Sequence, residues 1–233
     1  MISYDRRRYR FPVSVEYAKH GFLRRLGTLL RCIENTFELL PPNRDDEPPE
    51  RNVRIDATIN IEAFVFNVFG AIDNLAWIWV SEIQLTKSDG SAIPNGWVGL
   101  GPKNEYVRKS LPQTLQIYLS SRDVWFQHLE NFRHALAHRI PLYIPPYIVS
   151  PEREEEWRSL ERAIDDAMLR GDAEAEAQLK ESQNKLCRFR PWMIHSFSEG
   201  SRPVAFHAQL IADFKTLEEL ALKILPELPD ISS

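Results

Sequence analysis

The sequence predicts an all-α protein, a four-to-five-helix bundle with a charged helical insertion and a short β-hairpin before the last helix. Apolar residues recur at helical spacing in four long segments. Stretches rich in proline or glycine separate several of these segments. Hydrophobic residues make up 43% and aromatic residues 11% of the chain, which is ample for a packed core. We therefore expect a single helical domain over residues 1–233.

The four long helices are expected over residues 15–40, 57–83, 111–140 and 206–228. The first should end at the two prolines that follow it, because proline cannot continue a helix. The second is apolar nearly all round, which is typical of a helix at the centre of a bundle. The positions expected to be buried in the first and third helices are Phe22, Leu26, Leu29, Leu30, Ile33, Phe37, Leu40, Leu115, Tyr118, Leu119, Val124, Leu129, Phe132 and Leu136.

The connections between these helices have their own composition. Residues 41–51 are polar and proline-rich, and residues 87–103 are rich in glycine, so both should be loops. Residues 141–149 contain three prolines and should run extended. Residues 151–186 predict a peripheral, charged helical insertion that turns at its Arg-Gly-Asp sequence. Strand-like runs on either side of residues 198–203 predict the short hairpin.

Charge is distributed unevenly along the chain. The formal net charge of −4 argues against a generic nucleic-acid-binding protein. Residues 151–186 hold eleven acidic and six basic side chains, so the rest of the chain is close to neutral. Residues 1–31 hold eight Lys or Arg and only two acidic residues. This basic region either meets a polyanion or forms a solvated face, and the solvated face is the more frequent reason for such a cluster.

The expected location is the cytoplasm, with no membrane partner. Cys32 and Cys187 offer neither a disulfide framework nor the spacing of a metal site, as in a reducing compartment. No apolar stretch at the N-terminus resembles a signal peptide. The longest apolar tract, residues 61–80, contains four Asp, Glu or Asn residues, which makes it too polar for a lipid-facing span.

A short motif, RHALAH, closes the third expected helix with Arg133 and His138 at its two ends. Arginine and histidine at a similar spacing also occur at Arg122/His128, Arg190/His195 and Arg202/His207, so spacing alone selects none of them. In the last two pairs a proline follows the arginine directly, within strand-like or loop sequence.

Arg122 lies on the same expected helix as Arg133, so the pair Arg122/His128 remains a rival candidate for the functional motif. Three features favour Arg133: a polar residue, His134, follows it, small alanines lie between it and His138, and the helix stops there. A helix end is a place where side chains can face a cleft.

This motif in a helical setting resembles the R-x4-6-H motif of the HEPN family, helical domains found in many ribonuclease toxins and antiviral effectors. The resemblance covers residues 10–140 and 205–228 at the level of architecture. It implies a metal-independent endoribonuclease, acting as a toxin or defence effector, that cleaves RNA by attack of the 2′-hydroxyl. The family pools its motif residues in a dimer, which implies a homodimer here. The stretch of about sixty-five residues after the motif departs from the family, where another bundle helix generally follows quickly.

The residue types suit this chemistry. Histidine titrates near pH 6.5, so His138 is the expected base, and Arg133 is the expected clamp on the phosphate. Residues five apart in a helix lie about 140° apart around its axis, so these two do not share a face in one chain. His134 does share a face with His138 and joins the catalytic set. The shared face also raises the alternative of a metal site, but no Cys or acidic ligand is obviously placed to complete it, so no metal and no cofactor are expected.

Asp73 is the expected acidic helper on the apolar second helix. A carboxylate on a buried helix is costly unless it is paired. Pairing with Arg133 or His138 would neutralise it and orient the base. In the alternative, Asp73 pairs with a surface arginine while Asn67 and Asn74 bond within the bundle.

The residues expected to bind RNA follow the motif. Arg139 can contact phosphates, and Tyr143 and Tyr147 can stack on bases. The alternative for the tyrosines is packing against the bundle.

Two readings without catalysis stay open. In one, the histidines and arginines of the helix end only interact with the helix dipole. In the other, the chain is a catalytically inert helical module that binds a protein partner or a nucleotide, with residues 151–186 as its interaction surface. The partners to consider are therefore an RNA substrate, a second copy of the chain, and an antitoxin or regulatory partner protein.

Overall fold

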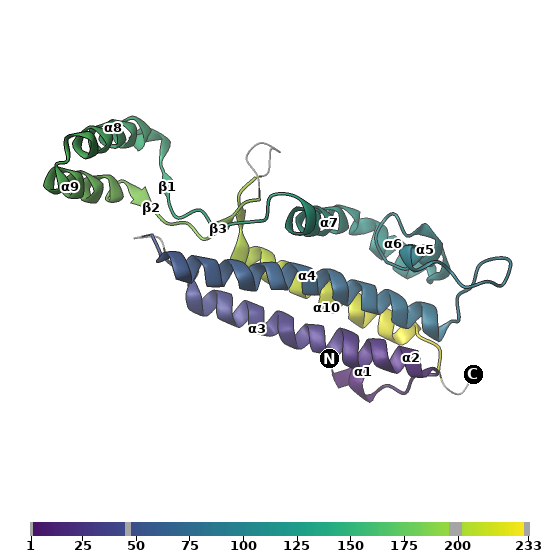
Figure 1. Ribbon diagram of the computed structural model, residues 1–233. Coiled ribbons are helices and arrows are strands. Elements are labelled where there is room, and N and C mark those ends of the chain that lie inside the picture. The colour runs from purple at the N-terminus through teal and green to yellow at the C-terminus, as the bar shows by residue number, and fades with distance from the viewer. Residues whose placement is uncertain (1, 45–47, 196–201, 231–233) are drawn as a thin grey trace.

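The computed structural model describes residues 2–44, 48–195 and 202–230, and in these ranges the protein is mostly helical (Figure 1). The α-helices are α1 (Ile2–Arg6), α2 (Pro12–Val15), α3 (Leu23–Leu39), α4 (Arg51–Glu82), α5 (Glu105–Ser110), α6 (Gln113–Ser121), α7 (Asp123–His138), α8 (Glu154–Arg170), α9 (Ala173–Asn184) and α10 (Phe206–Ile224). The π-helix is η1 (Glu16–Phe22), and the 3-10 helices are η2 (Asn95–Trp97), η3 (Pro151–Arg153) and η4 (Leu225–Glu227). The strands are β1 (Ile148–Val149), β2 (Cys187–Arg188), β3 (Trp192–Met193) and β4 (Val204–Ala205). The all-α class is confirmed.

Helix α4 lies at the centre of the body. It packs against α3, α10 and α7, and Figure 1 shows α5, α6 and α7 on the side of α4 opposite α3. Buried residues run along α4 from Ala57 to Glu82, as expected for a central helix. Its N-terminus lies at Arg51, six residues before the predicted start at 57. Much of the extra length is exposed, because only the later turns are covered on several sides.

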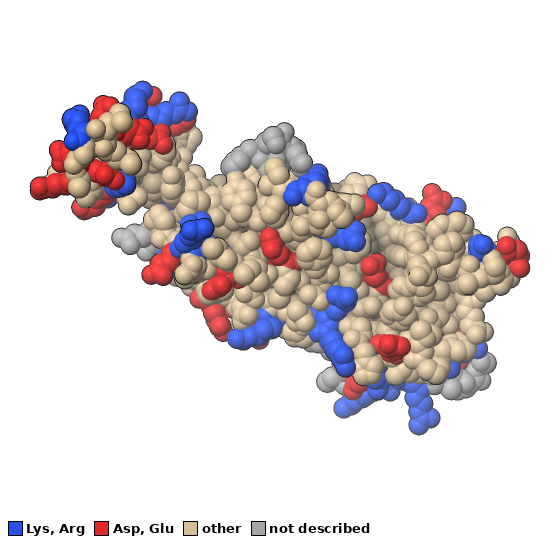
Figure 2. Space-filling model, viewed as in Figure 1, with Lys and Arg blue, Asp and Glu red and all other residues tan. Residues whose placement is uncertain are grey.

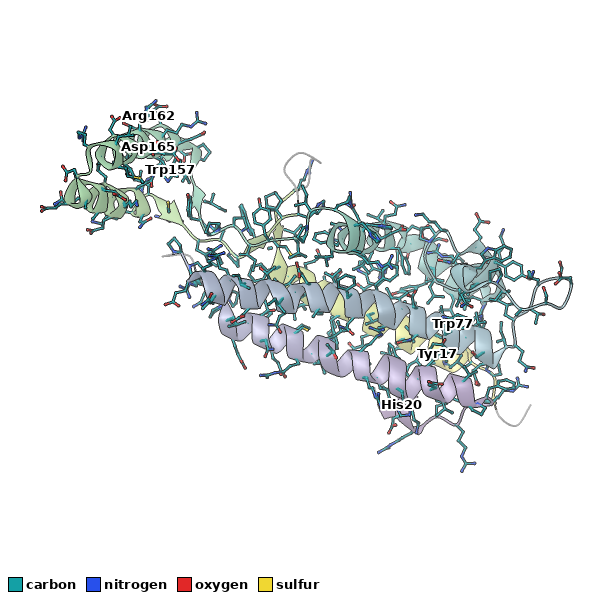
Figure 3. The ribbon with its side chains drawn as sticks, in the orientation of Figure 1. Tyr17, His20, Trp77, Trp157, Arg162 and Asp165 are labelled. Atoms are coloured by element: carbon teal, nitrogen blue, oxygen red, sulfur yellow. The ribbon has the colours of Figure 1, made fainter. Side chains whose placement is uncertain are left out.

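The first predicted helix is continuous from Pro12 to Leu39 and ends just before the two prolines, as predicted. Residues of η1 form wider π-type turns in it, where the ring of Tyr17 stacks on Trp77 of α4 at 5.4 Å between centroids (Figure 3). Leu30 is 36% exposed, so its predicted burial is wrong. Its neighbour Leu29 occupies the buried position, and one residue along a helix is a rotation of about 100° away from the core.

The third predicted helix is wrong in one respect, because it is broken into α6 and α7 at Arg122. Arg122 adopts φ −105° and ψ 7°, and Asp123 begins a new helix whose first turn its charge favours. The break changes the helical phase. Val124, predicted to be buried, is therefore 79% exposed.

After α7 the chain runs extended, as predicted, and the charged insertion follows. Strand β1 pairs antiparallel with β2, so both ends of the insertion leave the body together. Gly171, at φ 71°, closes α8, and the Asp172 carboxylate accepts a hydrogen bond from the Ala175 amide to begin α9, which confirms the predicted turn. The α8–α9 hairpin projects from the body (Figure 1), and Figure 2 shows its surface crowded with charges.

The predicted short hairpin is present as β3 paired antiparallel with β4, with Trp192 opposite Ala205. Residues 198–201 of its predicted turn lie outside the described residues. The β1–β2 pair is a second small sheet that the sequence pattern did not predict.

The N-terminal segment is tied to the end of α10. The Tyr4 hydroxyl donates to the Ala221 carbonyl at 2.7 Å. Arg7 Nη2 donates to the carbonyls of Leu228 and Pro229 at 2.7 and 2.8 Å. Part of the basic N-terminal region is therefore structural.

Helix α4 is long and apolar enough to cross a membrane by length and composition. However, 56% of its most apolar window is buried inside the fold, which is consistent with the core helix of a soluble protein.

Candidate functional site

A polar cluster lies where α3 and α4 pack together. Arg25 of α3 donates from Nη1 to Asn67 Oδ1 at 3.0 Å and from Nε to Asn74 Oδ1 at 3.2 Å. Both asparagines thus bond within the body, as one alternative predicted. Gly70 leaves the space through which the Arg25 side chain passes, because a Cβ there would lie 2.5 Å from the Arg25 Cζ.

Asp73 lies beside this cluster on α4 and is half-buried. Burial raises the pKa of its carboxyl to about 6, while the positive charges of Arg133 and Arg25 act in the opposite direction. Within the part of the chain that the structure describes, no hydrogen bond or ion pair reaches this carboxylate. Arg133 therefore acts on Asp73 through its charge alone, without a direct contact. The site thus combines a carboxyl whose pKa is about 6 with a nearby cation.

Arg133 turns from α7 toward α4. Its guanidinium carbon lies 4.8 Å from the centre of the Phe69 ring, which is a cation–π contact. The side chain is half-buried. Phe69 is one turn before Asp73 on α4, so the contact fixes the cation on the same side of the helix as the carboxylate.

A small pocket with a volume of about 70 Å³ opens between α4, α7 and the loop at residues 99–104. Asp73 lies on its α4 wall and Glu130 on its α7 wall, with Lys103 from the loop. The Lys103 Nζ donates to Glu130 Oε1 at 2.8 Å. The remaining lining is mostly apolar, so the carboxyl of Asp73 faces a space of low polarity that could admit a few waters or part of a ligand.

The two histidines of the motif follow Glu130 along α7. His134 Nε2 lies 3.7 Å from Glu130 Oε1, and its ring centre lies 5.9 Å from that of His138. The predicted shared face of His134 and His138 is therefore present. His138 is exposed at the last residue of α7, whereas Arg133 faces α4. Within one chain Arg133 and His138 therefore face different directions, as helical geometry predicts.

The three residues predicted to bind RNA lie in different surroundings. Arg139 folds back on its own helix and donates to the Asn131 carbonyl at 3.0 Å. Tyr143 exchanges two backbone hydrogen bonds with Ile194, at 2.8 and 3.0 Å. The ring of Tyr147 lies 6.2 Å from that of Trp157 in α8 and is 36% exposed. The ring of Tyr147 therefore contacts the charged insertion.

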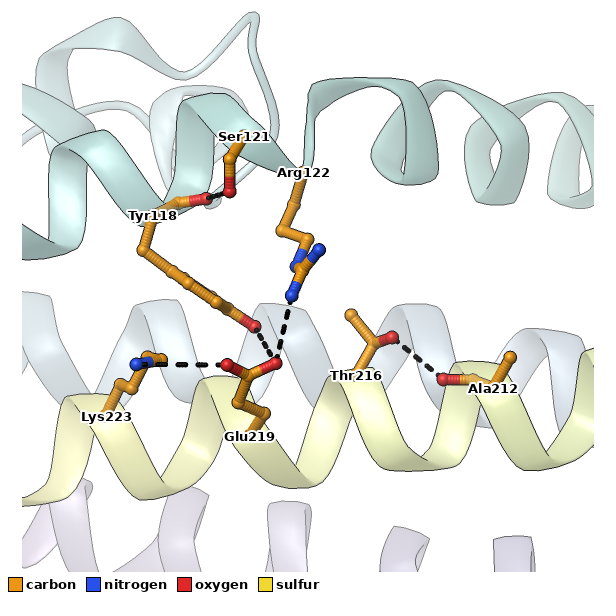
Figure 4. Close-up of polar contacts among 7 residues, drawn as sticks. All are labelled: Tyr118, Ser121, Arg122, Ala212, Thr216, Glu219 and Lys223. Atoms are coloured by element: carbon orange, nitrogen blue, oxygen red, sulfur yellow. Dashed lines mark hydrogen bonds and ion pairs between the residues drawn. The ribbon is translucent and has the colours of Figure 1, made fainter.

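The competing motif at Arg122 and His128 is held in structural contacts. Arg122 Nη2 and the Tyr118 hydroxyl each donate to Glu219 Oε2 at 3.1 Å, which joins the α6–α7 junction to α10 (Figure 4). The ring of His128 lies 4.6 Å from that of Phe132. Arg122 is therefore paired with a carboxylate, unlike Arg133.

The histidines of the other two arginine–histidine pairs are buried. His207 bonds the Leu40 carbonyl at 2.7 Å through Nε2, and the ring of His195 lies 5.5 Å from that of Phe132. Both pack in the interior of the fold, away from an open site.

Sequence reasoning missed the residues that complete the site: Arg25, Phe69, Gly70, Lys103 and Glu130. Gly70 alone left a signal, because an isolated glycine inside a helix usually has a packing reason. The others reach the site only through contacts between distant segments.

Among the described residues, no group of three or more His, Cys, Asp or Glu side chains is arranged to hold a metal ion. No protein-family model, curated protein or solved structure matches the chain. The case for a function therefore rests on the geometry of α4 and α7.

Proposed function

We propose that the protein is a HEPN-like, metal-independent endoribonuclease of the cytoplasm, acting as a toxin or defence effector. One observation carries the proposal: Asp73, whose pKa is raised to about 6, lies on a pocket wall within the electrostatic reach of Arg133. A titratable group with a perturbed pKa next to a specific charge partner in a pocket is typical of active sites.

In this proposal helices α3, α4, α7 and α10 form the HEPN-like bundle, and α8–α9 is its insertion. Arg133 would hold the scissile phosphate and stabilise the charge that develops on it. His138 would take the proton of the 2′-hydroxyl, whose oxygen then attacks the phosphorus. The bond to the 5′-oxygen breaks, and this leaving oxygen takes up a proton. The products would be a 2′,3′-cyclic phosphate and a 5′-hydroxyl.

The proposal includes a homodimer. Arg133 and His138 face different directions in one chain, so a second copy would bring its own His138 toward Arg133. Asp73 and His134 would act as positioning residues, with the charge of Asp73 attracting Arg133 and His134 lying between Glu130 and His138.

The test is cleavage of total RNA and tRNA by the purified chain in EDTA. Folded His138→Ala and Arg133→Ala variants should lose the cut, and Arg122→Ala should keep it because Arg122 serves the contact with Glu219. The new ends should carry 2′,3′-cyclic phosphates. A wild-type protein that leaves all RNA intact would refute the nuclease, and variants that cut equally well would refute the roles assigned to Arg133 and His138.

The projecting hairpin favours a second candidate, a catalytically inert module that binds an antitoxin or a regulatory partner protein. Met168 and Leu169 of α8 are 56% and 87% exposed among its charged residues. Exposed apolar side chains within a charged surface suit a protein contact. This candidate predicts intact RNA and a partner whose binding is lost when Met168 and Leu169 are both changed to Ser.

A further inference from the structure

A second hollow lies at the root of the α8–α9 hairpin, distinct from the pocket beside Asp73. Its volume is about 290 Å³, close to the lower end of the roughly 300–1,000 Å³ of pockets that hold small ligands. Three arginines line it: Arg153 from η3, Arg188 from β2 and Arg190 just after β2. Ser150 and Trp192 complete its polar and aromatic lining. We call these five residues the root groove.

The arginines of the root groove form no ion pairs in the described ranges, although they lie beside the acidic segment of the chain. Eleven of the acidic residues of the chain lie in residues 151–186, yet no carboxylate lines the groove. Arg158 and Arg162, one and two turns further along α8, pair with Glu154 and Glu155. In the described ranges none of the three groove arginines forms an ion pair, although Glu152, next to Arg153 in the sequence, bonds the Ser150 hydroxyl. Several arginines without ion pairs around one hollow favour an anionic ligand, and phosphate suits the geometry of the guanidinium group.

An aromatic platform lies beside these charges. Trp192 is 38% exposed, although its strand is anchored by pairing with Ala205. Its backbone amide also donates to the Arg190 carbonyl at 2.7 Å, which fixes the two residues relative to each other. An exposed indole next to arginines is the combination on which proteins bind single-stranded nucleic acids, with bases stacked on the ring and phosphates on the arginines.

We propose that the root groove binds single-stranded RNA, with two or three phosphates on Arg153, Arg188 and Arg190 and one base stacked on Trp192. The choice of RNA as the nucleic acid rests on the proposed function. The Ser150 hydroxyl donates to the Glu152 carboxylate, so its oxygen is left to accept a hydrogen bond from a 2′-hydroxyl, the group by which proteins distinguish RNA from DNA.

The groove lies at the far end of the extended segment that follows α7 (Figure 1). RNA held in the groove can therefore continue along that segment to His138 at the end of α7. Figure 2 shows charges of both signs on the hairpin, and acidic residues outnumber basic ones by eleven to six in residues 151–186. This negative balance disfavours RNA along the hairpin and leaves the root as the favourable path. An RNA would then have to be long enough to reach from the groove to His138, where the cut is made.

The test measures the fluorescence anisotropy of a labelled 12-nucleotide single-stranded RNA bound to the full chain in EDTA, in a His138→Ala background that prevents cleavage. The Arg188→Gln/Arg190→Gln variant should bind at least tenfold more weakly. Its salt dependence should also fall, by about 0.7 in the slope of log affinity against log salt for each phosphate that the variant no longer binds. Trp192→Ala should weaken binding about fivefold or more without changing that slope, and Trp192→Phe should restore it.

The matched control is Arg158→Gln/Arg162→Gln, which removes the same charge from the neighbouring helix, where Figure 3 places Arg162 on α8. It should bind RNA as the parent does. Equal loss in both double variants, or no loss in either, would overturn the groove. Equal affinity for DNA of the same sequence would overturn the assignment to RNA.

The two proposals fail separately. Cleavage that depends on His138 but is indifferent to the groove variants, together with unchanged RNA binding, removes the groove and leaves the nuclease. Groove-dependent RNA binding by a chain whose His138→Ala variant cuts as wild type does removes the assigned catalytic residue and leaves the groove.

Discussion

The side chain of Arg25 occupies the space that any side chain at residue 70 would need, since a Cβ at Gly70 would lie 2.5 Å from the Arg25 Cζ. Gly70→Ala should therefore displace Arg25 from Asn67 and Asn74 and destabilise the fold by about 1–3 kcal/mol, the usual range for overpacking. Urea unfolding followed by circular dichroism measures this change.

Gly27 on α3 is the control for this substitution, because a Cβ there meets nothing within 4 Å. Gly27→Ala should stabilise the protein by about 0.5–1 kcal/mol, since alanine is the better helix former. Equal stabilisation by both alanines would show that Arg25 moves aside at little cost.

Two carboxyls, half-buried Asp73 and buried Asp213, should make stability fall as the pH rises. Burial raises the pKa of both Asp73 and Asp213 to about 6 in the folded protein, against about 3.9 for an unfolded chain. Between these values the folded state holds more protons than the unfolded state, so the stability present below about pH 4 is lost as the pH passes 6. Urea midpoints measured from pH 4 to 7.5 should show this decline.

Asp73→Asn and Asp213→Asn should each flatten that decline and stabilise the protein at pH 7.5 by about 1 kcal/mol or more, since one pKa unit corresponds to about 1.4 kcal/mol. Asp213 accepts hydrogen bonds from Trp125 and Gln209, so its asparagine variant should retain RNA cleavage. Asp73→Asn should lose most of it. Equal activity of the two variants would exclude Asp73 from the site.

The contact between Arg122 and Glu219 predicts a stability effect without an activity effect. Both side chains are about two-fifths exposed, so Arg122→Gln should cost only about 0.5–1 kcal/mol in the free energy of unfolding. Glu219→Gln should have a similar cost, and the double variant should cost less than the sum. Additive losses in this double-mutant cycle would mean that the pair contributes nothing.

Arg7 predicts an anchoring role for the N-terminal segment. It donates to the carbonyls of Leu225, Leu228 and Pro229 beyond the end of α10, so Arg7→Ala should destabilise the protein by about 1–3 kcal/mol. Its exposed neighbour Arg8 is the comparison, and Arg8→Ala should change stability by less than about 0.5 kcal/mol. Matching losses in a thermal melt would contradict the anchor.

The sequence predicted the elements whose pattern is local. Helical spacing located the long helices, and the Arg-Gly-Asp turn was correct because Gly171 and Asp172 act on their immediate neighbours. The break at Arg122 was missed because an apolar pattern on both sides continued across it. The predicted burial of Val124 was wrong for the same reason, since apolar spacing does not show that the helical phase changes at Arg122.

The site was less predictable than the fold. Pairing of Asp73 with Arg133 or His138 was one of two alternatives, and the structure shows the charge of Arg133 acting on Asp73 without a hydrogen bond or ion pair between them. Arg25, however, belonged to a basic stretch that composition presented as a solvated face. Its contacts with Asn67 and Asn74 join residues more than forty positions apart, and no single-sequence pattern records such distances.

The paired strands β1 and β2 bear on the order in which the chain folds. The α8–α9 hairpin contains mostly local contacts, which form quickly, so it can be complete before α7 and α10 find each other. Once Val149 is paired with Cys187, the length of chain that must close between those two helices is more than halved. Each halving lowers the entropic cost of closing a loop by about 0.6 kcal/mol. The insertion that lengthens the chain thus removes much of its own kinetic penalty.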